Sequence, residues 1–173
     1  RGEERERWIL KTPGHLGYID TLIKVFPGAR VIQTHRNPLE TVPSAASMNT
    51  ALWDLMSDKP DAHEAGRQWS DRLSWGIQRC MDSRDRLPAD QFADIWFRDV
   101  LVDPIAEIER VYEIFGIEMI PEARAAMEQW RRDNRRDKRP AHDYVLADYG
   151  LSEAGIRRDF GPYLARHITP REG

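Results

Sequence analysis

The spacing of apolar residues along the chain predicts alternating strands and helices. Three short runs rich in apolar or β-branched residues are typical of strands, at 8–11, 29–35 and 92–97. Longer segments repeat apolar residues at helical spacing, at 16–26, 38–57, 63–86, 104–115, 121–132 and 153–160. This alternation favours a parallel sheet with helices on both faces. We therefore expect one α/β domain over residues 1–173, a partial three-layer sandwich around a short parallel sheet.

Local signals mark several helix ends. Three helix starts carry a capping side chain, two of them followed by proline: Asn37–Pro38, Asp103–Pro104 and Ser152. Glu40 lies three residues after the first cap and completes a capping-box pattern. Gly116 is typical of the glycine that follows a helix.

Composition narrows the class of protein. With 40% hydrophobic and 32% charged residues, the chain has the make-up of a soluble globular domain, and no apolar run is long enough to span a membrane. A net charge of −3 argues against nucleic-acid binding by bulk charge. The single cysteine, Cys80, excludes an internal disulfide and favours a cytoplasmic location. No metal site is expected, because the five histidines show no ligand spacing. We expect His35 to pack at a strand end, and His63 and His167 to be exposed.

A basic residue ends or directly follows each predicted strand: Lys11, Arg36 and Arg98. Ligands bind beyond the carboxyl ends of parallel strands, so this pattern suits an anion. Arg36 stands before a helix start, where free N–H groups and the helix dipole favour phosphate. Ser44, eight residues further on, could reach the same phosphate. The alternative is that Arg36 pairs with Glu40 and that Ser44 is simply exposed.

The residues around Arg36 resemble a conserved block of the sulfotransferase families. The resemblance is carried by WILKTPGHLGYIDTLIKVFPGARVIQTHRNPLETVPSAASM, with its Lys before Pro and His, its Phe-Pro, its His-Arg-Asn-Pro and its Ser eight residues after the Arg. IWFRDVLVDPIAEIERVYEIFGI and DYGLSEAGIRRDFGPYLARH are similar to the downstream and C-terminal blocks of the same families. The likeness extends over nearly all 173 residues.

The resemblance implies a P-loop-NTPase-like sulfotransferase fold and the co-substrate 3′-phosphoadenosine 5′-phosphosulfate. Arg36 and Ser44 would bind the 3′-phosphate of this donor. Phe97, or Trp96 beside it, would lie near the adenine, where the families often have Tyr. A late basic loop would also reach the 3′-phosphate, and its candidates here are Arg136, Lys138 and Arg139. The alternative for that basic stretch is a solvated helix end whose cations oppose the C-terminal dipole.

Transfer chemistry would fall to the block after the first predicted strand. By resemblance, Lys11 would offset charge on the sulfonate oxygens, and His15 would take the proton from an acceptor alcohol. That acceptor would be a small molecule, a lipid or a sugar.

The Gly-rich loop that holds the 5′-phosphosulfate in these families is not found in the sequence. We therefore expect an N-terminal portion to be missing and the isolated chain to be inactive. Exposed sheet edges would make a homo-oligomer plausible. The alternative is a non-catalytic nucleotide-binding or interaction module. An NTP-hydrolysing domain is disfavoured, because its phosphate-loop Lys and Mg²⁺-binding Asp have no counterpart here.

Overall fold

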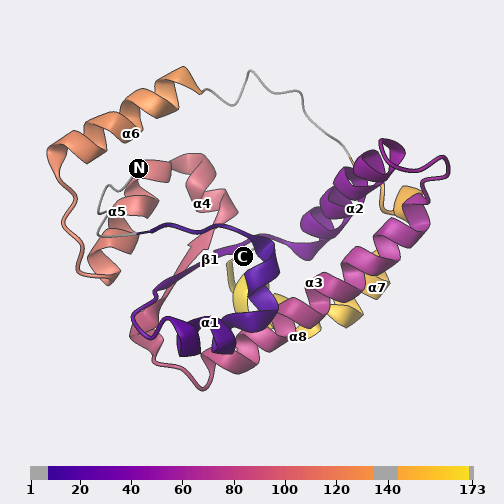
Figure 1. Ribbon diagram of the computed structural model, residues 1–173, viewed down its shortest axis with the longest axis horizontal. Helices are drawn as coiled ribbons and strands as arrows, with labels where there is room; N and C mark the ends of the chain where they lie inside the picture. Colours follow the sequence, from indigo (N-terminus) through magenta and orange to yellow (C-terminus); the bar gives the residue numbers. More distant parts are fainter. Residues whose placement is uncertain (1–7, 135–143, 172–173) are drawn as a thin grey trace.

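A computed structural model describes residues 8–134 and 144–171 (Figure 1). Two parallel strands, β1 (Val31–His35) and β2 (Phe92–Trp96), form the sheet. The helices on the N-terminal side of β2 are η1 (Pro13–Tyr18), α1 (Ile19–Val25), α2 (Pro38–Asp54), α3 (Ala62–Arg84) and η2 (Ala89–Gln91). Those after β2 are α4 (Phe97–Val102), α5 (Pro104–Ile114), α6 (Pro121–Asp133), η4 (Leu146–Tyr149), α7 (Glu153–Asp159), α8 (Gly161–Tyr163), η5 (Leu164–Ile168) and η6 (Thr169–Arg171).

The strand predicted at 8–11 is wrong. Residues 8–12 take no regular structure, and the only sheet in the described part of the chain is the pair β1–β2. The side chains of Trp8, Ile9 and Leu10 are 81%, 90% and 67% exposed. A strand is stabilised by a neighbour that takes up its backbone hydrogen bonds, and none of the described residues pairs with this segment.

The helix ends, unlike the strand at 8–11, agree with the capping residues seen in the sequence. The Asn37 side chain accepts a hydrogen bond from the Leu39 N–H, and Asp103 accepts from the N–H groups of Ile105 and Ala106. Ser152 caps α7 in the same way. All three predicted caps are confirmed. Gly116 follows α5 with a φ of 60°, the left-handed conformation in which glycine lacks a steric penalty.

Helices cover both faces of the sheet, but unequally. On one face, Gln33 and His35 of β1 are buried toward α3 and the C-terminal segment. On the other face, Ala93 and Ile95 of β2 pack against α5. The partner of Ala93 in the register is Ile32, which remains 49% exposed. The expected partial three-layer sandwich is confirmed, with α5 covering the β2 side only.

The largest core cluster ties the C-terminal segment to α2 and α3. Its buried members are Val42, Met81, Ile156, Phe160, Tyr163, Leu164 and Ile168. Because Ile168 belongs to this core, the residues just after it are held beside the carboxyl ends of β1 and β2. The fold thereby adds the end of the chain to the sheet edge at which the predicted site lies.

Among the helices of the described residues, none has the length and apolar character that crossing a lipid bilayer requires.

Candidate functional site

Arg36 is the first residue beyond β1 and directly precedes the cap of α2. Its Nε donates to Oε2 of Glu40 at 2.8 Å, which is the ion pair considered as the alternative to phosphate binding. Its guanidinium carbon lies 4.3 Å from the ring centroid of Phe97, the first residue of α4. Nη1 and Nη2 donate to no atom of residues 8–134 or 144–171. The fold thus brings Arg36 and Phe97 together from the ends of adjacent strands.

Ser44 lies on α2 and is half-buried rather than exposed. Its hydroxyl donates to the Tyr144 hydroxyl at 3.2 Å. No interaction joins Ser44 to Arg36 within the described parts of the chain. Their convergence on a single phosphate therefore stays a prediction. Tyr144 was not foreseen as a neighbour of Ser44, because 100 residues separate the two in sequence.

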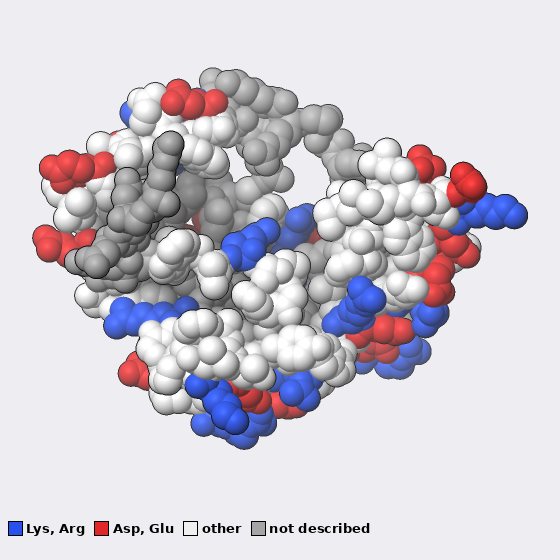
Figure 2. Space-filling view, viewed as in Figure 1, with Lys and Arg blue, Asp and Glu red and all other residues white. Residues whose placement is uncertain are grey.

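A small cavity of about 70 Å³ opens at the carboxyl edge of the sheet. Its lining includes three arginines, Arg36, Arg98 and Arg171, and two aromatic rings, Trp96 and Phe97. On the face shown in Figure 2, basic side chains lie in the hollow at the centre, whereas the left edge is mainly acidic and the lower and right-hand edges carry both signs. Planar guanidinium groups bind phosphate and aromatic rings stack on bases, so this lining suits a ligand that carries both a phosphate and a base.

A buried polar network lies beneath this cavity. His35 Nε2 contacts Oδ1 of Asp94 at 2.8 Å, and the Tyr163 hydroxyl lies 3.0 Å from His35 Nδ1. Arg84 Nη2 donates to Oδ2 of Asp94 at 3.0 Å. Burial tends to raise the pKa of Asp94, but the hydrogen bonds from His35 and Arg84 outweigh it and hold this pKa well below its usual range. The network fixes the ends of both strands, and the expected burial of His35 is confirmed.

His167 is buried, with 8% of its surface exposed, so the prediction that it is exposed is wrong. Its ring stacks on His35 with 4.4 Å between centroids, and its Nε2 has no hydrogen-bond partner among the described residues. Burial, and then the nearby His35, lower the pKa of His167 to about 4. The flanking polar residues misled the prediction, because burial here depends on the fold of the C-terminal segment. His63 is exposed, as expected.

Lys11 and His15 are exposed, Lys11 before η1 and His15 within it. Neither lines the cavity beside Arg36, so the structure does not bring the two predicted catalytic residues into that site. The remaining predicted donor-binding residues, Arg136, Lys138 and Arg139, lie outside the described residues.

The segment after Lys11 is anchored on α3. Arg79 Nε donates to the Gly17 carbonyl oxygen at 2.9 Å, and the Tyr18 ring meets Trp75 edge-on at 5.5 Å. A Cβ on Gly17 would lie 2.2 Å from the Trp75 ring. A larger residue would therefore force the partly exposed Trp75 ring to move, so glycine suits this close approach between η1 and α3.

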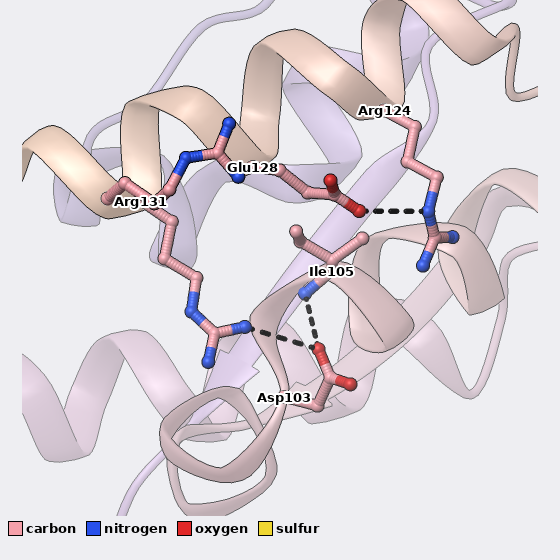
Figure 3. A pocket seen from close by; sticks show the side chains of 6 residues that line it. Asp103, Ile105, Arg124, Glu128 and Arg131 are labelled. Carbon is pink, nitrogen blue, oxygen red and sulfur yellow. Dashed lines mark hydrogen bonds and ion pairs between the residues drawn. The ribbon is translucent and has the colours of Figure 1, made fainter.

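A second cavity, of about 490 Å³, lies between α5 and α6 (Figure 3). Two of its three arginines pair with carboxylates: Arg131 with Asp103 at 3.8 Å, and Arg124 with Glu128 at 3.2 Å. The third, Arg132, donates to the amide oxygen of Gln129 at 2.8 Å. Unlike the cavity beside Arg36, this one has no aromatic ring among its described lining residues, so it offers no surface on which a nucleotide base could stack. Within residues 8–134 and 144–171, no group of three or more His, Cys, Asp or Glu side chains is arranged to hold a metal ion.

Comparison with known proteins gives consistent matches. The sequence profile of the sulfotransferase family matches residues 1–122. The omega-hydroxy-beta-dihydromenaquinone-9 sulfotransferases Stf3 of Mycobacterium bovis and Mycobacterium tuberculosis are each 25% identical over 114 residues, which is 65% of this chain and 29% of theirs.

Two solved structures share the fold. Sulfotransferase STF9 from Mycobacterium avium has a TM-score of 0.85 and 28% identity, over 93% of this chain and 42% of that one. Sulfotransferase STF1 from Mycobacterium tuberculosis H37Rv has a TM-score of 0.76 and 31% identity, over 90% of this chain and 40% of that one. The chain thus spans less than half the length of these relatives.

Proposed function

Because the chain belongs to the sulfotransferase family, we propose that it binds 3′-phosphoadenosine 5′-phosphosulfate through its 3′-phosphate and serves sulfonate transfer to an alcohol. The observation that carries this proposal is the position of Arg36. Its guanidinium lies at the carboxyl end of β1, at the start of α2 and against the Phe97 ring. A phosphate placed there would meet a forked cation and the positive end of the dipole of a 17-residue helix.

The ion pair between Arg36 and Glu40 is compatible with this role. The two side chains are 35% and 45% exposed, and such pairs contribute at most about 1 kcal/mol. Glu40 engages Nε, which leaves both Nη atoms for an anion. Glu40 would thus orient the guanidinium without neutralising its binding edge. Ser44 can contribute in the same way, because its hydroxyl rotates and can donate to a phosphate oxygen instead of to Tyr144.

In the proposed reaction, the alcohol oxygen attacks the sulfur while the bond from sulfur to the 5′-phosphate oxygen breaks. The products are a sulfate ester and 3′-phosphoadenosine 5′-phosphate. His15 would take the alcohol proton, and Lys11 would offset charge on the sulfonate oxygens. Both side chains are exposed, so binding of the acceptor alcohol would have to order them beside the reacting atoms.

Calorimetry tests the donor site directly. We expect the chain to bind 3′-phosphoadenosine 5′-phosphate more tightly than adenosine 5′-phosphate. Arg36→Ala should cost about 1–3 kcal/mol and remove that preference, because a charged hydrogen-bond donor is lost. Arg157→Ala is the matched control, since Arg157 also pairs with a glutamate four residues away, at 2.7 Å, but lies on α7. Equal binding of both nucleotides by the unaltered chain would contradict the proposal.

An apolar alcohol, such as a lipid, is the acceptor class we favour. Met48 and Leu52 follow Ser44 at four-residue spacing on α2 and are 58% and 49% exposed. The face that offers Ser44 to the donor therefore continues as an apolar strip, and the Stf3 relatives are named for a lipid-like alcohol. Leu52→Asp should weaken binding of a fluorescent long-chain alcohol, whereas Leu101→Asp on α4, with 48% of Leu101 exposed, should not. Equal binding by both variants would exclude this face.

The second candidate is a nucleotide-binding module without catalysis, favoured by the cavity beside Arg36, which neither Lys11 nor His15 lines. The 173 residues contain no Gly-rich phosphate loop. We expect no appreciable sulfonate transfer from the isolated chain for that reason. Formation of a sulfated alcohol from labelled donor would overturn this expectation. The cytoplasmic location and the homo-oligomer expected from the sequence stay predictions.

A further inference from the structure

The cavity beside Arg36 contains a second stacked guanidinium, that of Arg171. We propose that Arg171 is a further binding residue for the phosphate of the donor nucleotide. This inference rests on the proposed function and extends it to the C-terminal segment, which lies outside the part of the chain matched by the family profile.

Trp96 holds Arg171 in place. The Trp96 Nε1 donates to the His167 carbonyl oxygen at 2.8 Å, and its ring stacks with His35 at 5.1 Å between centroids. The Arg171 guanidinium carbon lies 3.9 Å from the Trp96 ring centroid. The platform under Arg171 is therefore fixed by a hydrogen bond and by a buried neighbour, and the guanidinium is positioned before any ligand arrives.

Arg171 repeats the arrangement of Arg36. Trp96 and Phe97 are consecutive residues, and each carries a guanidinium against its ring. Each guanidinium is also held by one carboxylate, Arg36 by Glu40 at 2.8 Å and Arg171 by Asp99 at 3.0 Å. Both arginine side chains are partly exposed, at 35% and 45%, so an anion can reach them.

The cavity wall combines positive charge with two aromatic rings. Its lining has three arginines and only two carboxylates, an excess of one positive charge (3 − 2 = 1). A purely structural salt bridge would need neither the aromatic platform nor a place on the cavity wall. Two forked cations on adjacent rings match a phosphate group beside a nucleotide base.

Titration calorimetry with 3′-phosphoadenosine 5′-phosphate tests the assignment. Arg171→Gln should weaken binding about tenfold, the effect of losing one charged hydrogen bond. Arg171→Lys should recover only part of this loss, because lysine keeps the charge but not the planar fork. Asp99→Asn should tighten binding roughly twofold to fivefold, since a carboxylate that competes for Arg171 is removed. In the Arg171→Gln background, Asp99→Asn should give a smaller gain.

The affinities of the variants distinguish failure of the proposed function from failure of the role proposed for Arg171. If the unaltered chain binds no nucleotide, or Arg36→Ala has no effect, the proposed function fails and this inference fails with it. If Arg36→Ala weakens binding while Arg171→Gln binds like the Arg157→Gln control, only the role of Arg171 is refuted. Circular dichroism and thermal unfolding of each variant identify misfolding. If Arg171→Gln misfolds, an unchanged affinity in Asp99→Asn refutes the assignment.

Discussion

Acidification should destabilise the fold through one buried histidine, His167. Its ring is 8% exposed and stacked on His35, and its Nε2 has no partner among the described residues. Protonating it would place a positive charge in a buried site, against the His35 ring and without a hydrogen-bond acceptor for Nε2 among the described residues. Its pKa is accordingly lowered from 6.5 to about 4, first by burial and then by His35.

Proton linkage gives the sign and the size of the pH dependence of the unfolding free energy. Between about pH 6.5 and pH 4 the unfolded chain binds a proton at residue 167 that the folded chain does not, so the free energy of unfolding falls as pH falls. The full shift corresponds to roughly 3 kcal/mol, of which about 2 kcal/mol is lost between pH 7 and pH 5. Asp94 acts in a lower window: its folded pKa is depressed, so its contribution is present above the ordinary pKa of 3.8 and is lost only below it.

Urea unfolding followed by tryptophan fluorescence at pH 7 and pH 5 measures this loss. His167→Phe keeps a ring against His35 but cannot take up a proton, so its stability should change about 2 kcal/mol less than that of the unaltered chain over this range. His63→Gln, at an exposed position, should retain the full dependence. The reasoning would be refuted if His167→Phe showed the same pH dependence as the unaltered chain.

Two further predictions concern packing and capping. Gly17→Ala should lower the free energy of unfolding by about 1–3 kcal/mol, because its Cβ would meet the Trp75 ring at 2.2 Å. Gly28→Ala is the control, since no atom lies within 4 Å of the new Cβ. Equal stabilities of the two variants would disprove the close approach. Asp103→Ala should lower the free energy of unfolding by about 1 kcal/mol, because it removes the α5 cap, whereas Asp103→Asn should leave it nearly unchanged. Thermal unfolding distinguishes the two variants. An alanine variant as stable as the unaltered chain would exclude a stabilising cap.

Features with a local cause could be predicted from sequence. The caps at Asn37, Asp103 and Ser152 each satisfy backbone N–H groups within three residues, so no distant partner is needed. The glycine at 116 is equally local, since its conformation depends on its own backbone.

Features that depend on tertiary partners were missed. The apolar run at 8–11 has strand-like composition, but no described residue pairs with it. Strand β2 passes directly into α4 at Phe97 without a proline, a glycine or a capping hydrogen bond from a side chain, so nothing local announces that helix. The burial of His167 likewise follows from the ring stack with His35, 132 residues away (167 − 35).

The candidate site contains both residues that are close together in sequence and residues that only the fold brings together. Arg36, Glu40 and Ser44 lie within nine residues of sequence, so their pattern could be recognised together. Trp96, which the resemblance places near the adenine, and Arg171, which only the structure adds, lie 60 and 135 residues beyond Arg36 (96 − 36 and 171 − 36). They reach it because Trp96 pairs with His35 in the parallel register and because the core around Ile168 holds the end of the chain against the sheet. Anion binding at this edge is therefore a property of the assembled fold, and a peptide carrying only the Arg36 block would lack the second cation and both aromatic platforms.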